Sequence, residues 1–241
     1  MIIKTEGILI YKIKYSDTSQ IVHLLTNDLG VRAFMVKGIR AKKSKNPSSL
    51  LEYLNIWNVV ASQSVRSELL TVREISLANQ YSNTAGNITQ SSIFLFIAEL
   101  LHKCITKPSL DLDLYNFTKK SLLYLDKSNK PIPDFHLWFI ANLTLYLGIK
   151  PLNNYSKTDK YFDIQHGYFI STPIDLSRTF SETSGLLLSH YLNINIEQCS
   201  EVLAPITERS RFLDEMLMYY GFHLDHFKGM QTPTILKSVM R

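Results

Sequence analysis

The sequence has 241 residues, 45% of them hydrophobic and 20% charged, with a formal net charge of +5. These values are typical of a folded globular chain, and no uninterrupted apolar run approaches the roughly 18 to 20 residues that a membrane helix needs. The N-terminal residues lack the regions of a secretory signal, so we expect a cytoplasmic protein that contacts no membrane. Two cysteines cannot form a structural zinc site unless histidines complete it, and Cys104, in an apolar helical pattern, is expected to be a buried free thiol.

The excess positive charge lies in the first third of the chain. Residues 1–80 contain 11 Lys and Arg against 6 Asp and Glu, whereas the remainder contains 15 of each. The stretch between Asp28 and Glu52 has no acidic residue and contains Arg32, Lys37, Arg40, Lys42, Lys43 and Lys45. This asymmetry favours a polyanion partner such as nucleic acid. A Lys-rich loop that keeps the surface soluble and protects a sheet edge explains the same composition.

The first 75 residues alternate between β-rich segments and turn signals, which predicts a small all-β unit. Strands are expected at residues 8–15, 20–26, 31–37, 51–61 and 68–75. Gly30 ends a hairpin connection where a positive φ is needed, and residues 39–49 form a polar, basic loop. Five strands of this length match an OB-fold barrel, although SH3-like barrels have a similar size.

The apolar spacing becomes helical after about residue 76. Helices are expected at residues 88–107, 110–126 and 134–147, then near 181, 205–222 and 232–240. Gly148 is predicted as the C′ residue of the third helix, and residues 151–173 as an irregular insertion with a small hairpin. The predicted fold class is therefore α+β, with a five-stranded OB-fold β-barrel over residues 1–78 and a mainly α-helical domain over residues 79–241.

Motifs that would indicate catalysis are missing from the sequence. It contains no G-x-x-x-x-G-K-[ST], G-x-G-x-x-G, G-x-S-x-G or H-E-x-x-H. Asp111 and Asp113 open a predicted helix, where acids favour the positive end of the helix dipole. His223 and His226 have no Cys or Glu partner at a matching interval. We therefore expect no enzymatic activity and no cofactor.

The basic loop lies beside predicted strands that carry Tyr15, Phe34 and Trp57. Proteins that bind single strands combine cations along the phosphate backbone with aromatic rings that stack on bases. Each of these aromatics is also explained as barrel core, most clearly Trp57. The cations are therefore the stronger candidates for a nucleic-acid site.

Three N-terminal segments resemble the bacterial RecO family of recombination mediators in order and spacing. They are YSDTSQIV at residues 15–22, LTNDLG at 25–30 and VKGIR at 36–40. The similarity extends more loosely over the chain, through FDIQHGYF at residues 162–169 and a last helix with RFL at 211–213.

The resemblance implies an N-terminal OB-fold joined to a helical domain, acting at the nucleoid in homologous-recombination repair without catalytic turnover. Proteins of this family bind single- and double-stranded DNA and anneal complementary strands. They also recognise the acidic tail of single-strand-binding protein and cooperate with RecR to load the RecA recombinase. Carried over residue by residue, the match supports Lys37 and Arg40 as DNA contacts, with Lys42, Lys43 and Lys45 in the adjoining loop and Arg32 as a weaker addition.

One segment departs from the family pattern. Many relatives carry a four-cysteine zinc site in the segment that corresponds to residues 151–172, where this sequence has no cysteine. We therefore expect no zinc and a hairpin held by packing, through Tyr161, Phe162 and Tyr168.

A second function stays open alongside the mediator hypothesis. The protein would then be an interaction adaptor whose basic barrel docks acidic protein tails, with DNA binding incidental to its charge. Strand annealing by the isolated protein separates the two hypotheses, because an adaptor has no reason to accelerate it.

Overall fold

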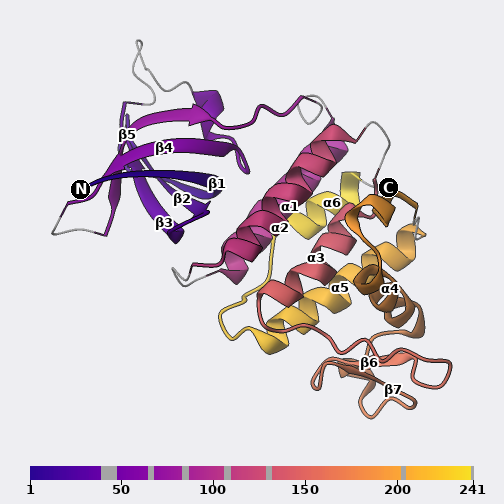
Figure 1. Ribbon diagram of the computed structural model, residues 1–241. Helices are drawn as coiled ribbons and strands as arrows, with labels where there is room; N and C mark the ends of the chain where they lie inside the picture. Colours follow the sequence, from indigo (N-terminus) through magenta and orange to yellow (C-terminus); the bar gives the residue numbers. More distant parts are fainter. Residues whose placement is uncertain are drawn as a thin grey trace. The chain divides into compact units, whose positions relative to one another are not determined.

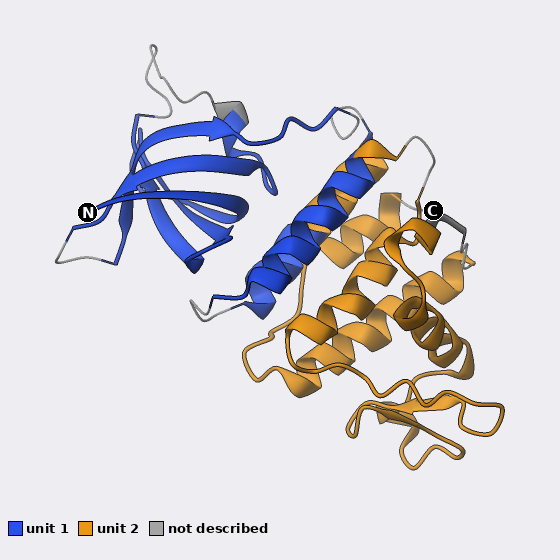
Figure 2. Cartoon of the chain, in the orientation of Figure 1, with its two compact units in different colours: residues 1–87, 97–126 blue, residues 88–96, 127–241 orange. Residues whose placement is uncertain are grey.

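The computed structural model describes residues 1–38, 48–64, 68–82, 87–105, 110–128, 132–201 and 205–239. The chain forms two compact units (Figure 2): unit 1 contains residues 1–87 and 97–126, and unit 2 contains residues 88–96 and 127–241. These units cross the expected boundary between residues 78 and 79, because part of the helical region groups with the barrel. The division into two folding domains at that boundary remains a prediction.

Five strands of unit 1 close a barrel in the order β1-β2-β3-β5-β4 (Figure 1). They are β1 (Ile2–Lys14), β2 (Gln20–Thr26), β3 (Gly30–Val36), β4 (Ile56–Ser62) and β5 (Leu70–Leu77), with a short 3-10 helix, η1 (Ser48–Leu51), before β4. The first half of β1 pairs with β4 and its second half with β2, while β3 and β5 pair in parallel. This topology is that of an OB-fold and confirms the expected fold class.

Strand β1 begins at Ile2, six residues earlier than expected. The early segment contains Gly7, which suggests a strand boundary in the sequence. In the structure Gly7 is needed for close packing, because an added Cβ would lie 3.0 Å from the Leu24 Cβ. A glycine inside a strand can mark such a close approach rather than an end.

The barrel core is built from inward-facing aliphatic and aromatic side chains. Its buried members are Leu9, Val22, Leu24, Phe34, Val36, Leu51, Trp57, Val59, Ala61 and Leu70. Trp57 is fully buried and its indole Nε1 donates a hydrogen bond to the Leu50 carbonyl at 2.8 Å. The interpretation of Trp57 as barrel core is therefore confirmed.

Two helices follow the barrel, α1 (Ile88–Cys104) and α2 (Leu112–Lys127). Within unit 1, the Glu6 carboxylate on β1 accepts hydrogen bonds from the Tyr115 hydroxyl and from Lys119 Nζ on α2, the latter at 2.5 Å. Burial alone would raise the pKa of Glu6, but the hydrogen bonds from Lys119 and Tyr115 bring it below its usual value. A charged, partly buried pair therefore attaches α2 to the barrel.

Unit 2 is mainly helical. Its elements from residue 127 onward are α3 (Phe135–Tyr146), β6 (Tyr161–Asp163), β7 (Tyr168–Ile170), η2 (Leu176–Arg178), α4 (Glu182–Asn193), η3 (Ile196–Glu201), α5 (Ile206–His223) and α6 (Thr232–Val239). Helix α3 packs against both α4 and α5. It ends as expected at Gly148, which has a φ of +72° and is followed by a hydrogen bond from Ile149 N to Thr144 O at 3.1 Å.

The β6–β7 hairpin is held by an aromatic cluster. The Phe162 ring lies 5.1 Å from Phe169, 5.0 Å from Phe180 and 5.4 Å from Tyr219, measured between centroids. The expectation for Phe162 is confirmed. The expectation for Tyr168 is wrong, because its side chain is 38% exposed. Phe162 and Phe169 pair on the buried face of the hairpin, and Tyr168, adjacent to Phe169 in β7, therefore points to the opposite face.

We predict that Phe162→Ala lowers the free energy of unfolding by about 3 to 5 kcal/mol, the usual cost of removing a buried phenyl ring. Urea unfolding followed by circular dichroism measures this change. The matched variant Tyr168→Ala removes a partly exposed ring from the same hairpin and should cost far less. Equal losses from both substitutions would contradict the assignment of Phe162 as the centre of the cluster.

Candidate nucleic-acid interface

One end of the barrel brings several strand ends together. Lys14 at the end of β1 pairs with Gln20 at the start of β2, and Gln20 pairs with Val36 at the end of β3. Met35 pairs with Thr71 near the start of β5. The β1–β2 connection, the end of β3 and the start of β5 therefore meet at this end.

The outer surface at this end carries an apolar row. Because Val22 and Phe34 point into the core, their neighbours Ile21 and Met35 lie on the outer side of the barrel, where Ile21 is partly exposed but Met35 is buried, at 7% exposed. Ile13 pairs with Ile21 and lies on the same outer side, with 45% of its surface exposed. Ile13 and Ile21 thus form a short apolar row across β1 and β2.

An exposed aromatic and two exposed cations border the row. Tyr15, two residues beyond Ile13, is 65% exposed, and Lys37, two residues beyond Met35, is also exposed. Arg73 lies at a β-bulge of β5, is exposed, and its Nε donates to Ser62 Oγ at 3.0 Å. We call this surface the strand-end face; it consists of Ile13, Tyr15, Ile21, Lys37 and Arg73.

The structure brings only one of the predicted DNA contacts to the strand-end face. Lys37 is part of it, whereas Arg32 is half-buried and pairs with Leu24 towards the other end of the barrel. Five residues of extended strand separate Arg32 from Lys37, a distance of about 17 Å. The other predicted contacts lie outside the described residues, in the segment that directly follows Gly38; they are Arg40, Lys42, Lys43 and Lys45.

Arg73 was not among the residues predicted from sequence. Strand alternation marks it as outward-facing, since Val72 packs against the core. Its position near Lys37 depends on the parallel pairing of β3 with β5, which is a tertiary contact. Sequence periodicity could identify the exposed cation but not its neighbour.

The nearby cation Lys12 makes its contacts within the barrel. Its Nζ donates to the Leu51 carbonyl at 2.6 Å and lies 4.8 Å from the centroid of the Tyr53 ring. Burial lowers the pKa of Lys12, and the nearby Glu52 partly offsets that shift. Lys12 therefore helps to hold η1 rather than presenting its charge to solvent.

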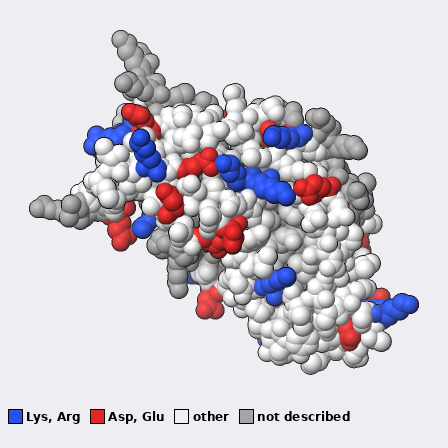
Figure 3. Space-filling view, in the orientation of Figure 1, with Lys and Arg blue, Asp and Glu red and all other residues white. Residues whose placement is uncertain are grey.

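Basic and acidic residues balance over the described part of the barrel, which contains six Lys and Arg and six Asp and Glu between residues 1 and 82. Figure 3 shows Lys and Arg interspersed with Asp and Glu among the described residues of the face in view. The surplus charge of the N-terminal third therefore belongs to sequence outside the described residues. The strand-end face is therefore distinguished by the position of its exposed cations and not by an excess of positive charge over the described barrel.

Helix α1 packs against Tyr11, an outer side chain of β1 next to this face. The His102 ring stacks on Tyr11 with centroids 3.7 Å apart and planes 5° apart, and His23 lies 5.8 Å from Tyr11. Burial lowers the pKa of both histidines. The strand-end face is consequently bounded on one side by a neutral aromatic contact.

Several of the residues considered for metal binding or catalysis are buried or hydrogen-bonded in the described part of the chain. Both cysteines are buried free thiols, which confirms the expectation for Cys104, and burial raises the pKa of Cys199 to about 12. No group of three or more His, Cys, Asp or Glu suited to a metal occurs in the described ranges. Asp111 caps α2 by accepting a hydrogen bond from Leu114 N at 2.8 Å, and His223 Nε2 lies 2.7 Å from the Ile164 carbonyl.

Comparison with known proteins identifies the family. Residues 1–81 match the family model described as Recombination protein O N terminal. The DNA repair protein RecO of Bacteroides fragilis is 30% identical over 242 residues, which cover 99% of this chain and 99% of that protein. Those of Flavobacterium psychrophilum and Azobacteroides pseudotrichonymphae are 28% and 26% identical, with 99% of each chain covered. The chain belongs to the RecO family.

The RecO N-terminal match spans the whole barrel and therefore the strand-end face. The four-cysteine zinc site of many RecO proteins does not fit residues 151–172 of this chain. That segment supplies no thiolate, and its Phe162 and Phe169 fill the interior of the hairpin. Across the ranges that the structure describes, no helix is both long and apolar enough to span a bilayer.

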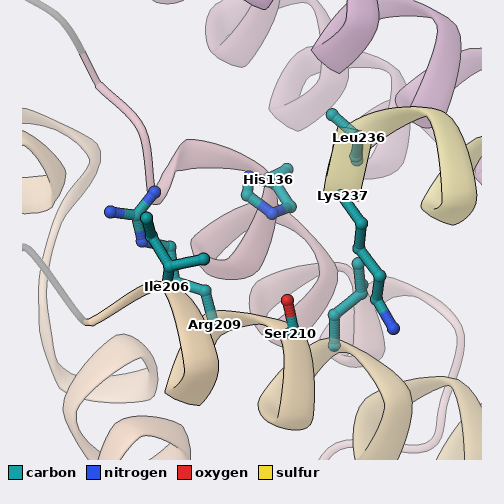
Figure 4. A pocket seen from close by; sticks show the side chains of 7 residues that line it. His136, Ile206, Arg209, Ser210, Leu236 and Lys237 are labelled. Carbon is teal, nitrogen blue, oxygen red and sulfur yellow. The ribbon is translucent and has the colours of Figure 1, made fainter. Parts of the chain in front are cut away.

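Unit 2 of this RecO family member contains a small pocket between α3, α5 and α6 (Figure 4). It encloses about 20 Å³, room for roughly one water molecule. Arg209 Nε forms an ion pair with Asp134 Oδ1 at 3.0 Å, and Lys237 Nζ donates to Asp214 at 2.7 Å. Both cations at the pocket already have carboxylate partners, so the pocket does not compete with the strand-end face as a phosphate site.

His136 lines this pocket and is 2% exposed. Burial, with the nearby Arg209 charge, lowers the pKa of His136 to about 3. The folded state therefore keeps the imidazole neutral, whereas the unfolded chain takes up a proton below about pH 6.5. Stability should fall as the pH drops below 6.5, by about 1.4 kcal/mol per pH unit for this residue.

We predict that His136→Gln reduces this pH dependence even if the variant is less stable at neutral pH. Urea unfolding at pH 7.5, 6.5 and 5.5 gives the slope for each protein. His226→Gln, at an exposed histidine of the same unit, is the control and should retain the wild-type slope. An unchanged slope for His136→Gln would show that other groups cause the acid sensitivity.

Proposed function

We propose that this protein is a DNA-repair and homologous-recombination mediator without catalytic activity. In this proposal it binds single- and double-stranded DNA, anneals complementary strands, and helps load the RecA recombinase onto strands covered by single-strand-binding protein. The observation that carries the proposal is the 30% identity to a DNA repair protein RecO over 99% of both chains. We further propose RecR and the acidic tail of single-strand-binding protein as its partners, and the bacterial cytoplasm and nucleoid as its place of action.

The strand-end face supports the DNA-binding part of this proposal. Lys37 and Arg73 place two exposed cations beside an apolar row and the exposed ring of Tyr15. OB-folds commonly bind oligonucleotides on this region of the barrel, between the β1–β2 and β4–β5 connections. Cations at the edge of an apolar surface suit a strand whose phosphates face one way and whose bases face the other.

The basic segment beyond Gly38 supplies the remaining charge in the proposal. It contains four cations and no acid; they are Arg40, Lys42, Lys43 and Lys45. Phosphate contacts position a protein on DNA without reading its sequence, so this site should bind all sequences with similar affinity. Sequence-independent binding is what an annealing factor requires.

Annealing of two complementary labelled oligonucleotides by the isolated protein tests the function. We expect the wild-type protein to accelerate annealing and the Lys42→Glu/Lys43→Glu variant to lose most of that acceleration. Lys157→Glu, an exposed charge reversal in unit 2, is the control and should anneal like the wild type. Folded protein that does not accelerate annealing would favour the adaptor that docks acidic tails, whereas full activity of the double variant would place the DNA site elsewhere.

Salt dependence gives a second, quantitative test. If four or five cations neutralise phosphates, the logarithm of the single-strand affinity should fall with the logarithm of salt at a slope of about −3, from roughly 0.7 per contact. Fluorescence anisotropy between 50 and 300 mM salt, on the order of one decade, measures this slope. Lys37→Glu should make the slope shallower by about 0.7 or more, while a slope near zero would rule out binding through phosphates.

A further inference from the structure

Tyr15 is held at the edge of a short, hydrogen-bonded connection. Its backbone N donates to the Ser19 carbonyl at 3.1 Å, and Ser16 N donates to the same oxygen at 3.1 Å. These bonds fix the first residue of the β1–β2 connection relative to the two strands. The backbone at Tyr15 is therefore held in place by hydrogen bonds, although 65% of the residue is exposed to solvent.

The other aromatic residues of the barrel are already engaged. Phe34 and Trp57 are fully buried in the core. The Tyr11 ring stacks on His102, and the Tyr53 ring lies beneath Lys12 Nζ. Within the barrel strands and their described connections, Tyr15 is thus the aromatic with a ring open to a ligand. The segments that the structure does not describe between residues 1 and 82 contain no aromatic residue.

The charges around the face define its two sides. Lys37 directly follows β3 and Arg73 lies on β5. Ile13 lies on β1 and Tyr15 directly follows it, about 10 Å from β3 at the usual strand spacing. The β1–β2 connection also carries Asp17, which is almost fully exposed and lies 3.3 Å from Lys14 Nζ. A phosphate backbone is therefore attracted to the β3–β5 side, because Lys14 and Asp17 offset each other at the β1–β2 connection. This places the bases towards Ile13 and Tyr15.

We propose that Tyr15 is a base-stacking residue that makes the strand-end face selective for unpaired DNA, with Ile13 as an apolar neighbour of the stacked base. This inference rests on the proposed DNA-binding function and assigns its specificity to one side chain. An unpaired base offers an open π-face to the ring, whereas the base faces of a duplex are covered by their neighbours. The cations contact phosphates in both forms, so the stack adds affinity only for the single strand.

Abasic DNA separates stacking from phosphate binding. The probes are a labelled oligothymidine and an oligomer of abasic deoxyribose phosphates of equal length, so that their charges match. The wild-type protein should prefer oligothymidine by about 5- to 150-fold, the effect of one stacked base. Tyr15→Ala should lose most of that preference while its affinity for the abasic oligomer stays within about twofold, and Tyr15→Phe should retain the preference because it keeps the ring.

Two control measurements separate loss of base stacking from loss of phosphate binding and from loss of stability. Lys37→Glu should weaken both probes by a similar factor, because it removes a charge contact that does not depend on bases. Circular dichroism melting of Tyr15→Ala should match the wild type, since the ring packs against nothing in the core.

Three outcomes would overturn the inference. If Tyr15→Ala weakened both probes equally, the side chain would not act by stacking. If the wild type bound both probes equally well, no base would be stacked, although DNA binding itself would stand. If the wild type bound neither probe, the proposed function would fail and the inference with it.

Discussion

Closure of the barrel through β1 is the constraint on which unit 1 depends. This strand has 13 residues and must pair with β4 over its first half and with β2 over its second half. An irregularity in its pairing between Leu9 and Tyr11 allows the strand to bend from one partner to the other. Once this register is set, each side chain on the five strands is committed either to the core or to the outer surface. The strand-end face is the part of that outer surface where the end of β1, the start of β2, the end of β3 and the start of β5 meet.

Local sequence information predicted most elements of the fold. Hydrophobic alternation identified the barrel strands, and Gly30 and Gly148 marked a turn and a helix end that both adopt positive φ. The prediction failed at the start of β1, because Gly7 resembles a strand boundary when its close neighbour Leu24 is unknown. Such close approaches involve residues far apart in sequence, so periodicity carries no sign of them.

The candidate site shows the same limit. Lys37 was predictable from its position at the end of an alternating strand, but Arg73 was not, because its placement depends on the parallel pairing of β3 with β5. Sequence favoured Trp57 as barrel core but could not separate Tyr15 from Phe34, since both lie in strand-like segments. The register assigns two of them to the core and leaves the third in solvent.

The hairpin of unit 2 is held by packing between aromatic rings. Phe162 and Phe169 are cross-strand partners on its buried face, and Phe180 and Tyr219 complete the contact from neighbouring segments. Aromatic edge-to-face contacts contribute about 0.5 to 1.5 kcal/mol beyond the burial of area. Tyr168 shows that aromatic content alone does not identify the members of such a cluster, because strand alternation places it on the opposite face.

The attachment of β1 to the helices limits how this chain can be shortened. Glu6 finds both hydrogen-bonding partners on α2, and Tyr11 finds its stacking partner on α1. A recombinant fragment that stopped at residue 78 would retain every barrel strand but leave a carboxylate and an aromatic ring without these supports. The barrel and residues 97–126 of the first two helices therefore form one compact unit, and ending the chain at residue 78 would remove the helical part of it.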